Sequence, residues 1–76
     1  MLDIRVSLNY DNGDYMAEYV EHSRLKAICE GGDEKSVIRQ AKRYVEDRGK
    51  EGRVISTYGT VYEYKGKEWK KTEPVK

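Results

Sequence analysis

The residues best suited to metal chemistry lie in one short acidic stretch, residues 10–15, with the sequence YDNGDY. Asp11, Asn12 and Asp14 place oxygen atoms, the ligands that calcium prefers, around Gly13. A calcium loop of the EF-hand type spreads its ligands over a longer segment and closes with a bidentate glutamate, and residues 10–15 have neither feature. The Asn-Gly pair instead favours a tight hairpin turn, so we expect no metal here.

His22 and Cys29 are the other side chains with chemical potential, and they are the only histidine and cysteine of the chain. A structural zinc site needs a full tetrahedral set of ligands, and a catalytic thiol needs a lowered pKa and a base placed beside it. Carboxylate pairs such as Glu46 and Asp47 have no predicted pocket that would shift a pKa. The sequence therefore predicts no catalytic, metal or cofactor site, and we expect the protein not to be an enzyme.

The C-terminal part of the chain combines aromatic rings with lysines. Rings between cations on a sheet can stack bases and neutralise phosphates, and aromatic residues are also frequent anchors of protein interfaces. The same pattern suits cross-strand packing of the core, with lysines that protect an edge strand. The sequence leaves these alternatives open. The residues expected to contact a partner or a nucleic acid are Tyr62, Tyr64, Trp69, Lys65, Lys67, Lys70 and Lys71.

The composition limits what these residues can do. A chain of 76 residues forms one small domain with little room for a deep pocket. Its 15 Lys and Arg residues nearly cancel its 14 Asp and Glu residues, which removes the overall positive field of a strongly basic nucleic-acid binder. The single cysteine cannot form an internal disulfide, and no apolar run is as long as a membrane span or a signal peptide. We therefore expect a cytoplasmic protein without membrane contact.

The first twenty residues predict a β-hairpin. Apolar and polar residues alternate along residues 2–10, which is the pattern of a half-buried strand. Asn12 and Gly13 form the dipeptide best suited to a two-residue type I′ loop. This loop predicts three facing pairs on the apolar side: Tyr10 with Tyr15, Leu8 with Ala17, and Val6 with Tyr19.

The middle of the chain predicts a short strand and a helix. Residues 25–29 favour a third strand, although the sequence does not decide whether they pair or run as an extended link. The carboxylate of Asp33 is expected to cap a helix over residues 34–48, and Gly49 is placed to end it. The helix carries one apolar stripe, formed by Val37, Ile38, Ala41, Tyr44 and Val45.

Residues 53–72 return to strand-like composition. Lys65 and Gly66 are expected to form the loop of a second hairpin, with Tyr62 opposite Trp69, and Gly59 indicates a bulge in its first arm. The sequence thus predicts an α+β fold of order β-β-(β)-α-β-β. In it, an antiparallel sheet of four to five strands has one helix packed on one face. Residues 1–72 form the single domain, and residues 73–76 form a C-terminal tail.

The first 49 residues resemble the HicB-like antitoxin family. The resemblance rests on Asp11-Asn12-Gly13-Asp14-Tyr15 with Ala17, then on Gly32-Asp33-Glu34, and then on the helix through Ala41. It implies a sheet-plus-helix domain similar to a partial double-stranded-RNA-binding fold, and a protein that binds and blocks a small RNA-cleaving toxin. Many members also carry a separate DNA-binding segment, whereas residues 53–72 here predict strands.

These observations lead to one preferred function and two alternatives. We expect a small protein-binding module, similar to a HicB-like antitoxin or to an inhibitor from a phage or mobile element, that occludes a toxin or a host factor. The first alternative is an RNA- or DNA-binding module that uses the aromatic and basic C-terminal hairpin. The second is a homodimer formed through an exposed edge strand.

Overall fold

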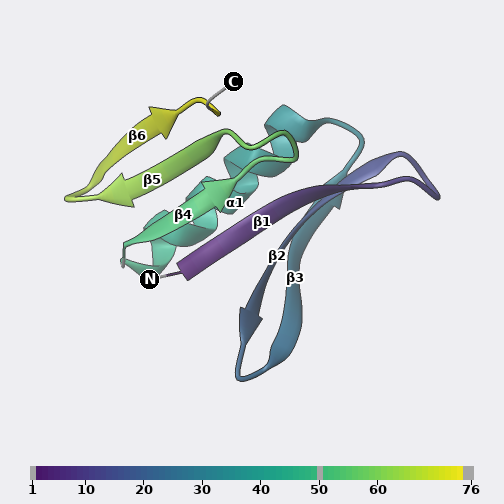
Figure 1. Cartoon of the computed structure of the whole chain (residues 1–76). Helices are drawn as coiled ribbons and strands as arrows, with labels where there is room; N and C mark the ends of the chain where they lie inside the picture. The colour runs from purple at the N-terminus through teal and green to yellow at the C-terminus, as the bar shows by residue number, and fades with distance from the viewer. Residues whose placement is uncertain (1, 50, 75–76) are drawn as a thin grey trace.

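A six-stranded sheet with a single helix across one face forms the body of the protein (Figure 1). The computed structural model describes residues 2–49 and 51–74. In chain order its elements are β1 (Leu2–Asn9), β2 (Asp14–Glu21), β3 (Arg24–Gly31), α1 (Glu34–Arg48), β4 (Gly52–Ile55), β5 (Val61–Lys65) and β6 (Glu68–Thr72). Among the described residues no helix is both long enough and apolar enough to cross a membrane.

The sheet is mixed, with the strand order β3-β2-β1-β4-β5-β6. Hairpins join the other neighbours in antiparallel pairs, but β1 and β4 are parallel because α1 carries the chain back across the sheet before β4 begins. Residues 2–5 of β1 pair with β4, and residues 5–9 pair with β2. The class α+β is as predicted. The prediction of an antiparallel sheet of four to five strands is wrong in both the number and the order of strands.

The missing strand is explained by Gly59. This residue has φ +95°, and its N–H donates a hydrogen bond to the Ser56 carbonyl oxygen at 3.2 Å. The Ser56 N–H in turn donates to the Thr60 carbonyl oxygen at 2.8 Å, which closes a tight loop. The glycine therefore marks a turn between β4 and β5, and the predicted bulge within one long arm is wrong. The question left open over residues 25–29 is also answered, since β3 pairs with β2.

The β1–β2 hairpin has a four-residue loop instead of the predicted two-residue loop. Leu8 faces Tyr15, while Tyr10 lies in the loop and is 88% exposed. The Asn9 side chain accepts the N–H of Asp11 at 3.0 Å, and the Gly13 N–H donates to the Asn9 carbonyl oxygen at 2.8 Å. The predicted facing pairs are therefore wrong. Each observed pair is shifted by two residues from the predicted one. Side chains two residues apart lie on the same face of a strand, so the predicted faces are correct.

The β5–β6 hairpin shows the same kind of shift. Tyr64 faces Trp69, and Tyr62 faces Lys71 instead of Trp69. The loop consists of Gly66 and Lys67, with φ +60° and +64°, as a type I′ turn requires. The loop predicted at residues 65–66 is therefore one residue too early, again without a change of face.

The helix matches its predicted bounds and buries its apolar stripe on the sheet. Gly49 ends the helix with φ +65°, and its N–H donates to the Glu46 carbonyl oxygen at 3.0 Å. Asp33 has the extended backbone of an N-cap, but its carboxylate makes no capping hydrogen bond, contrary to the prediction. The core of buried hydrophobic residues consists of Ile4, Val6, Ala17, Tyr19, Val37, Ile38, Ala41, Val45 and Val54.

The C-terminal half of α1 approaches β4 closely because Gly52 has no side chain. A Cβ atom there would lie 2.9 Å from Cγ1 of Val45 and 2.9 Å from the Leu2 carbonyl oxygen. After β6, Glu73 of the predicted tail forms an ion pair with Lys71 at 2.9 Å. The last two residues of that tail, 75 and 76, lie outside the described residues.

Candidate partner-binding surfaces

The predicted contact residues Tyr62, Tyr64 and Trp69 lie on the side of the sheet that faces α1, which we term the covered face. The centroids of the Tyr64 and Trp69 rings are 4.9 Å apart. Lys42 of α1 lies over the rings, with Nζ 4.1 Å from the Tyr62 centroid and 5.3 Å from that of Trp69. Burial lowers the pKa of Lys42. The rings are half-buried and pack against the core, and their contact with a partner stays a prediction.

The predicted lysines do not form one patch with these rings. Lys65 ends β5 and Lys67 lies in the following turn, so both are at the tip of the hairpin. Lys71 faces Tyr62 on the covered face, where it pairs with Glu73. Lys70 faces Glu63 on the opposite side of the sheet. The structure therefore distributes the positive charge over the hairpin tip and both faces.

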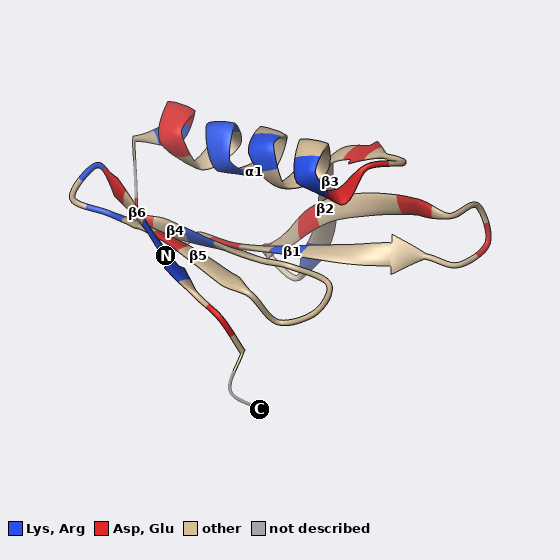
Figure 2. Ribbon diagram, turned by 90° about the horizontal axis from the view of Figure 1, so that it is seen from above, with Lys and Arg blue, Asp and Glu red and all other residues tan. Residues whose placement is uncertain are grey.

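The opposite side of the sheet, which we term the open face, has no helix or strand of the described chain upon it (Figure 2). Four charged residues form a row of alternating sign across it, because Asp3 is the register partner of Arg53, Arg53 of Glu63, and Glu63 of Lys70. The Arg53 guanidinium donates to both Asp3 carboxylate oxygens, at 2.9 and 2.8 Å. These hydrogen bonds hold the pKa of Asp3 below its usual value. We term Asp3, Arg53, Glu63 and Lys70 the charge row.

A second row on the open face is partly apolar. Ile55 is the register partner of both Arg5 and Val61, and both aliphatic side chains are half-buried. On β2 and β3, Val20 faces Leu25, and these side chains are 68% and 64% exposed. The aromatic residues of the strands all pack on the covered face instead, as shown by Tyr15, Tyr19, Tyr62, Tyr64 and Trp69.

A shallow depression of about 510 Å³ opens between these apolar and charged groups. It lies where the β1–β2 pairing stops at Arg5 and Glu18 and the first half of β1 continues with β4. Figure 1 shows β2 and β3 diverging from β1 at this end. The depression is lined by Leu2, Asp3, Arg5, Glu18, Val20, Leu25, Arg53 and Ile55. Its mixed lining can accept a side chain from a protein partner.

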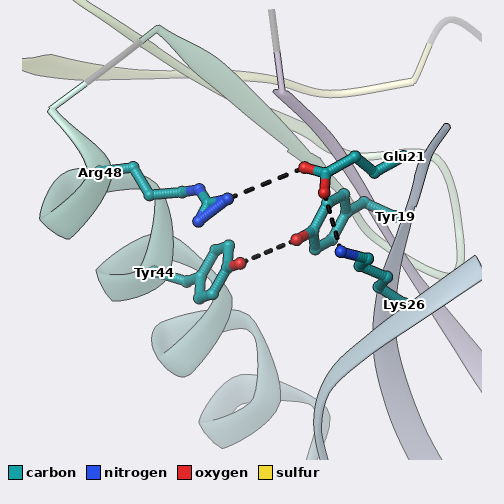
Figure 3. Close-up of polar contacts among 5 residues, drawn as sticks. All are labelled: Tyr19, Glu21, Lys26, Tyr44 and Arg48. Atoms are coloured by element: carbon teal, nitrogen blue, oxygen red, sulfur yellow. Dashed lines mark hydrogen bonds and ion pairs between the residues drawn. The ribbon is translucent and has the colours of Figure 1, made fainter.

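A polar network ties β2 and β3 to the end of α1 (Figure 3). The hydroxyl groups of Tyr19 and Tyr44 are hydrogen-bonded at 2.9 Å, and this bond raises the pKa of Tyr44. Glu21 accepts a hydrogen bond from Lys26 at 2.8 Å and lies 3.9 Å from Arg48. The guanidinium of Arg48 is 4.8 Å from the Tyr44 ring centroid. These contacts fix the orientation of the helix on the sheet.

The remaining chemical candidates lie far apart. Asn12 accepts the N–H of Asp14 with its side chain at 2.9 Å, as a turn residue does. No group of three or more His, Cys, Asp or Glu side chains within the described part of the chain could hold a metal ion. His22 lies in the β2–β3 turn with φ +52°. The Cys29 thiol donates to the Val37 carbonyl oxygen at 3.7 Å, and burial raises its pKa.

Sequence reasoning missed Val20, Leu25 and Lys42. Val20 carries a readable signal, because it is an apolar residue out of phase with Ala17 and Tyr19 on the same strand. No pattern in the sequence around Lys42 predicts that its side chain contacts the rings of Tyr62 and Trp69 on β5 and β6. The charge row could not be found either, because it depends on the parallel pairing of β1 with β4.

The fold and these surfaces define a small α+β domain in which a mixed six-stranded sheet has one covered and one open face. A scan against protein-family models and searches of curated proteins and of solved structures find no match. The resemblance to the HicB-like family therefore stays a prediction.

Proposed function

We propose that this chain is a non-enzymatic protein-binding module that occludes its partner with the open face, at Val20 and Leu25. One observation carries the proposal: these two aliphatic side chains face each other on neighbouring strands, mostly exposed, at the rim of the depression. Single exposed apolar residues are ordinary on protein surfaces. An apolar pair beside a hollow with a charged border has the composition of a protein interface.

The chemistry of the open face favours protein over nucleic acid. Asp3, Glu18 and Glu63 alternate there with basic residues, and acidic groups repel a phosphate backbone. Bases stack on aromatic rings that are presented to solvent, whereas the strand aromatics are on the covered face. Tyr62 and Trp69 also have the Lys42 ammonium over their rings. A stacked base would have to displace it.

The specific form of the proposal is an inhibitor similar to a HicB-like antitoxin, or one from a phage or mobile element, directed at a toxin or host factor. Its support is the β-β-β-α order of residues 2–48, which fits the sheet-plus-helix domain that the resemblance implies. The strands β4–β6 follow the helix, and the proposal concerns the inhibition of a partner. A neighbouring gene for a small basic protein with a catalytic histidine would support this form.

The test is capture of a partner from the organism that carries the gene, followed by titration of the purified pair. Val20→Asp combined with Leu25→Asp should weaken binding roughly tenfold to a hundredfold, because it puts charge in the centre of the apolar contact. The matched control is Tyr10→Asp, which changes an 88% exposed residue in the β1–β2 loop. Equal binding by the double variant and the wild type would refute the assignment of this surface.

A nucleic-acid-binding function is the second candidate, because the β5–β6 hairpin carries four lysines, Lys65, Lys67, Lys70 and Lys71. Such binding should fall steeply as salt rises, since it depends on counterion release. A titration with single- and double-stranded RNA at low and high salt measures this directly. Absent binding, or binding that does not change with salt, would remove this candidate.

A further inference from the structure

The charge row has a symmetry that matters for self-association. Read from β1 to β6 its signs are minus, plus, minus and plus, in the order Asp3, Arg53, Glu63 and Lys70. An alternating row with an even number of charges shows opposite signs when it is reversed. A two-fold axis parallel to the strands, between β4 and β5, reverses the row. It brings Arg53 against Glu63 of a second copy and Asp3 against Lys70 of that copy.

The neighbouring row of the open face, which contains Ile55 and Val61, is also complementary to itself about this axis. Ile55 and Val61 are register partners on β4 and β5, so the axis between these strands places each against the other in a second copy. Arg5 then meets Thr72, which is the next residue outward on the other side. An axis between β1 and β4 would instead set Arg5 against Ile55 and bury a charge on an aliphatic group. The β4–β5 axis is the choice that matches both rows.

From this complementarity we infer that β1, β4, β5 and β6 form, with their open face, the interface of a symmetric dimer of this chain. Two sheets packed face to face lie about 10 Å apart with their strands crossed by about 30°. Long side chains such as those of Arg53 and Glu63 can meet across that spacing, and the crossing makes the contacts nearest the axis the strongest. The Arg53–Glu63 and Ile55–Val61 contacts each occur twice, as isologous interfaces require.

The edges of the sheet are less suited to a dimer than this face. The β3 ladder has an irregularity between Ala17 and Glu18 of its neighbour, which interrupts the regular spacing of the edge. The other edge strand, β6, has five residues and carries Lys70 and Lys71. Bulges, short strands and lysines are devices that protect edges from pairing. Val20 and Leu25 lie on β2 and β3, outside the dimer interface, whereas Asp3, Arg5, Arg53 and Ile55 belong both to that interface and to the lining of the depression. The inference goes beyond the proposed function, and of the partner surface it leaves the Val20–Leu25 pair outside the dimer.

The experiment uses two charge-reversal variants, each of which should weaken the dimer alone, while a mixture of the two should form a mixed dimer. Arg53→Glu sets two acids against each other at both symmetry-related contacts, and Glu63→Arg sets two bases there. Each variant should dissociate at a concentration roughly tenfold or more above that of the wild type. In an equimolar mixture the substituted side chains meet as opposite charges and so do the native ones, so a mixed dimer should form. Sedimentation equilibrium and native mass spectrometry with one isotope-labelled variant measure both results.

The mixture separates the dimer contact from effects within one chain. Arg53→Glu also breaks the Asp3–Arg53 ion pair, but that loss persists in the mixture and cannot produce the rescue. Arg39→Glu is the matched control, because it makes the same change at an exposed position on α1. If either variant melts as an unfolded chain, Asp3→Lys and Lys70→Asp provide a second pair with the same logic.

Three results would overturn the inference: a wild type that is monomeric at millimolar concentration, a dimer that neither reversal weakens, or a mixture without rescue. A dimer weakened by Ala27→Lys, at an exposed position on β3, and not by the reversals would assign self-association to the edge instead. The expected result is a wild-type dimer whose dissociation constant rises with salt, together with mixed dimers of the two variants.

Discussion

The covered and open faces of the sheet differ in which side chains they carry and in how those side chains interact. On the covered face, Ile4, Val54 and Val45 are fully buried, and the tyrosines present their rings to the core and to α1. On the open face, charges of opposite sign face each other across strands, and Ile55 and Val61 lie in the neighbouring row. Burial therefore decides which residues stabilise the fold. Cross-strand pairing decides which residues are available for recognition.

The largest difference between the two faces is expected when one isoleucine on each face is truncated to alanine. Ile4→Ala removes a fully buried side chain and should lower the free energy of unfolding by about 2–4 kcal/mol. Ile55→Ala removes a half-buried side chain on the open face and should cost about 1 kcal/mol or less. Urea denaturation measures both. Equal losses would mean that the open face contributes to the core.

The close approach of α1 to the covered face gives the next largest effect. Gly52→Ala should destabilise the fold by about 1–3 kcal/mol, because the new methyl group would contact Val45 and the Leu2 carbonyl oxygen at 2.9 Å. Gly32→Ala is the control, since its added Cβ would have ordinary contact, 3.7 Å, with the Asp14 carboxylate. Thermal melting compares the two, and similar shifts would contradict the close packing at β4.

A smaller effect is expected where a hydrogen bond joins α1 to the covered face. Tyr44→Phe removes the hydroxyl partner of Tyr19 and should cost about 0.5–1.5 kcal/mol, whereas Tyr10→Phe in the loop should cost little. The bond raises the pKa of Tyr44, so the folded state keeps this proton longer than the unfolded state. The stabilisation is present below about pH 10 and is lost as the pH rises further.

The pH dependence of the unfolding free energy is a second test of the Tyr19–Tyr44 hydrogen bond. Unfolding free energies measured from pH 8 to pH 11 should fall less steeply for Tyr44→Phe than for the wild type. Identical slopes would show that the Tyr19–Tyr44 contact does not stabilise the neutral hydroxyl.

The smallest effect concerns the turn that holds Val20 and Leu25 together. Ser23 has φ +64°, a conformation that costs less for glycine, so Ser23→Gly should raise the free energy of unfolding by about 0.5–1 kcal/mol. Ser7→Gly, in the extended strand β1, should lower it instead. Chemical denaturation separates the two signs. A loss of stability in Ser23→Gly would argue against the left-handed conformation of this turn.

Local sequence patterns predicted which side chains share a face of a strand and where the helix lies. They could not predict contacts between residues that are distant in sequence. The alternation from Leu2 to Leu8 and the stripe from Val37 to Val45 depend on neighbouring residues, so their faces could be predicted. The register of a hairpin depends on which loop length has the lowest free energy. The loop predicted between β1 and β2 was too short, and the loop predicted between β5 and β6 began one residue too early. The positive φ angles of His22 and Ser23 were not predicted, because this segment has no Gly or Asn, the residues that usually indicate such a turn.

The candidate surfaces were predictable only in part for the same reason. The sequence grouped Tyr62, Tyr64 and Trp69 correctly as neighbours, since they lie on one hairpin, but it could not show that Lys42 covers them. The charge row on the open face depends on the parallel pairing of β1 with β4, which brings together Asp3 and Arg53, residues fifty positions apart in the sequence. No local signal in the chain encodes that pairing.

The chemical shifts of methyl groups show whether the open face is the surface that binds partners. Methyl groups report on one face of a strand, so a carbon-13 correlation spectrum can be recorded from low to high protein concentration and again with a captured partner. We expect the methyl shifts of Ile55 and Val61 to change with concentration and those of Val20 and Leu25 to change with the partner, while those of Val37 and Val45 stay unchanged. Changes confined to the methyl groups of the covered face, or their complete absence, would contradict this expectation.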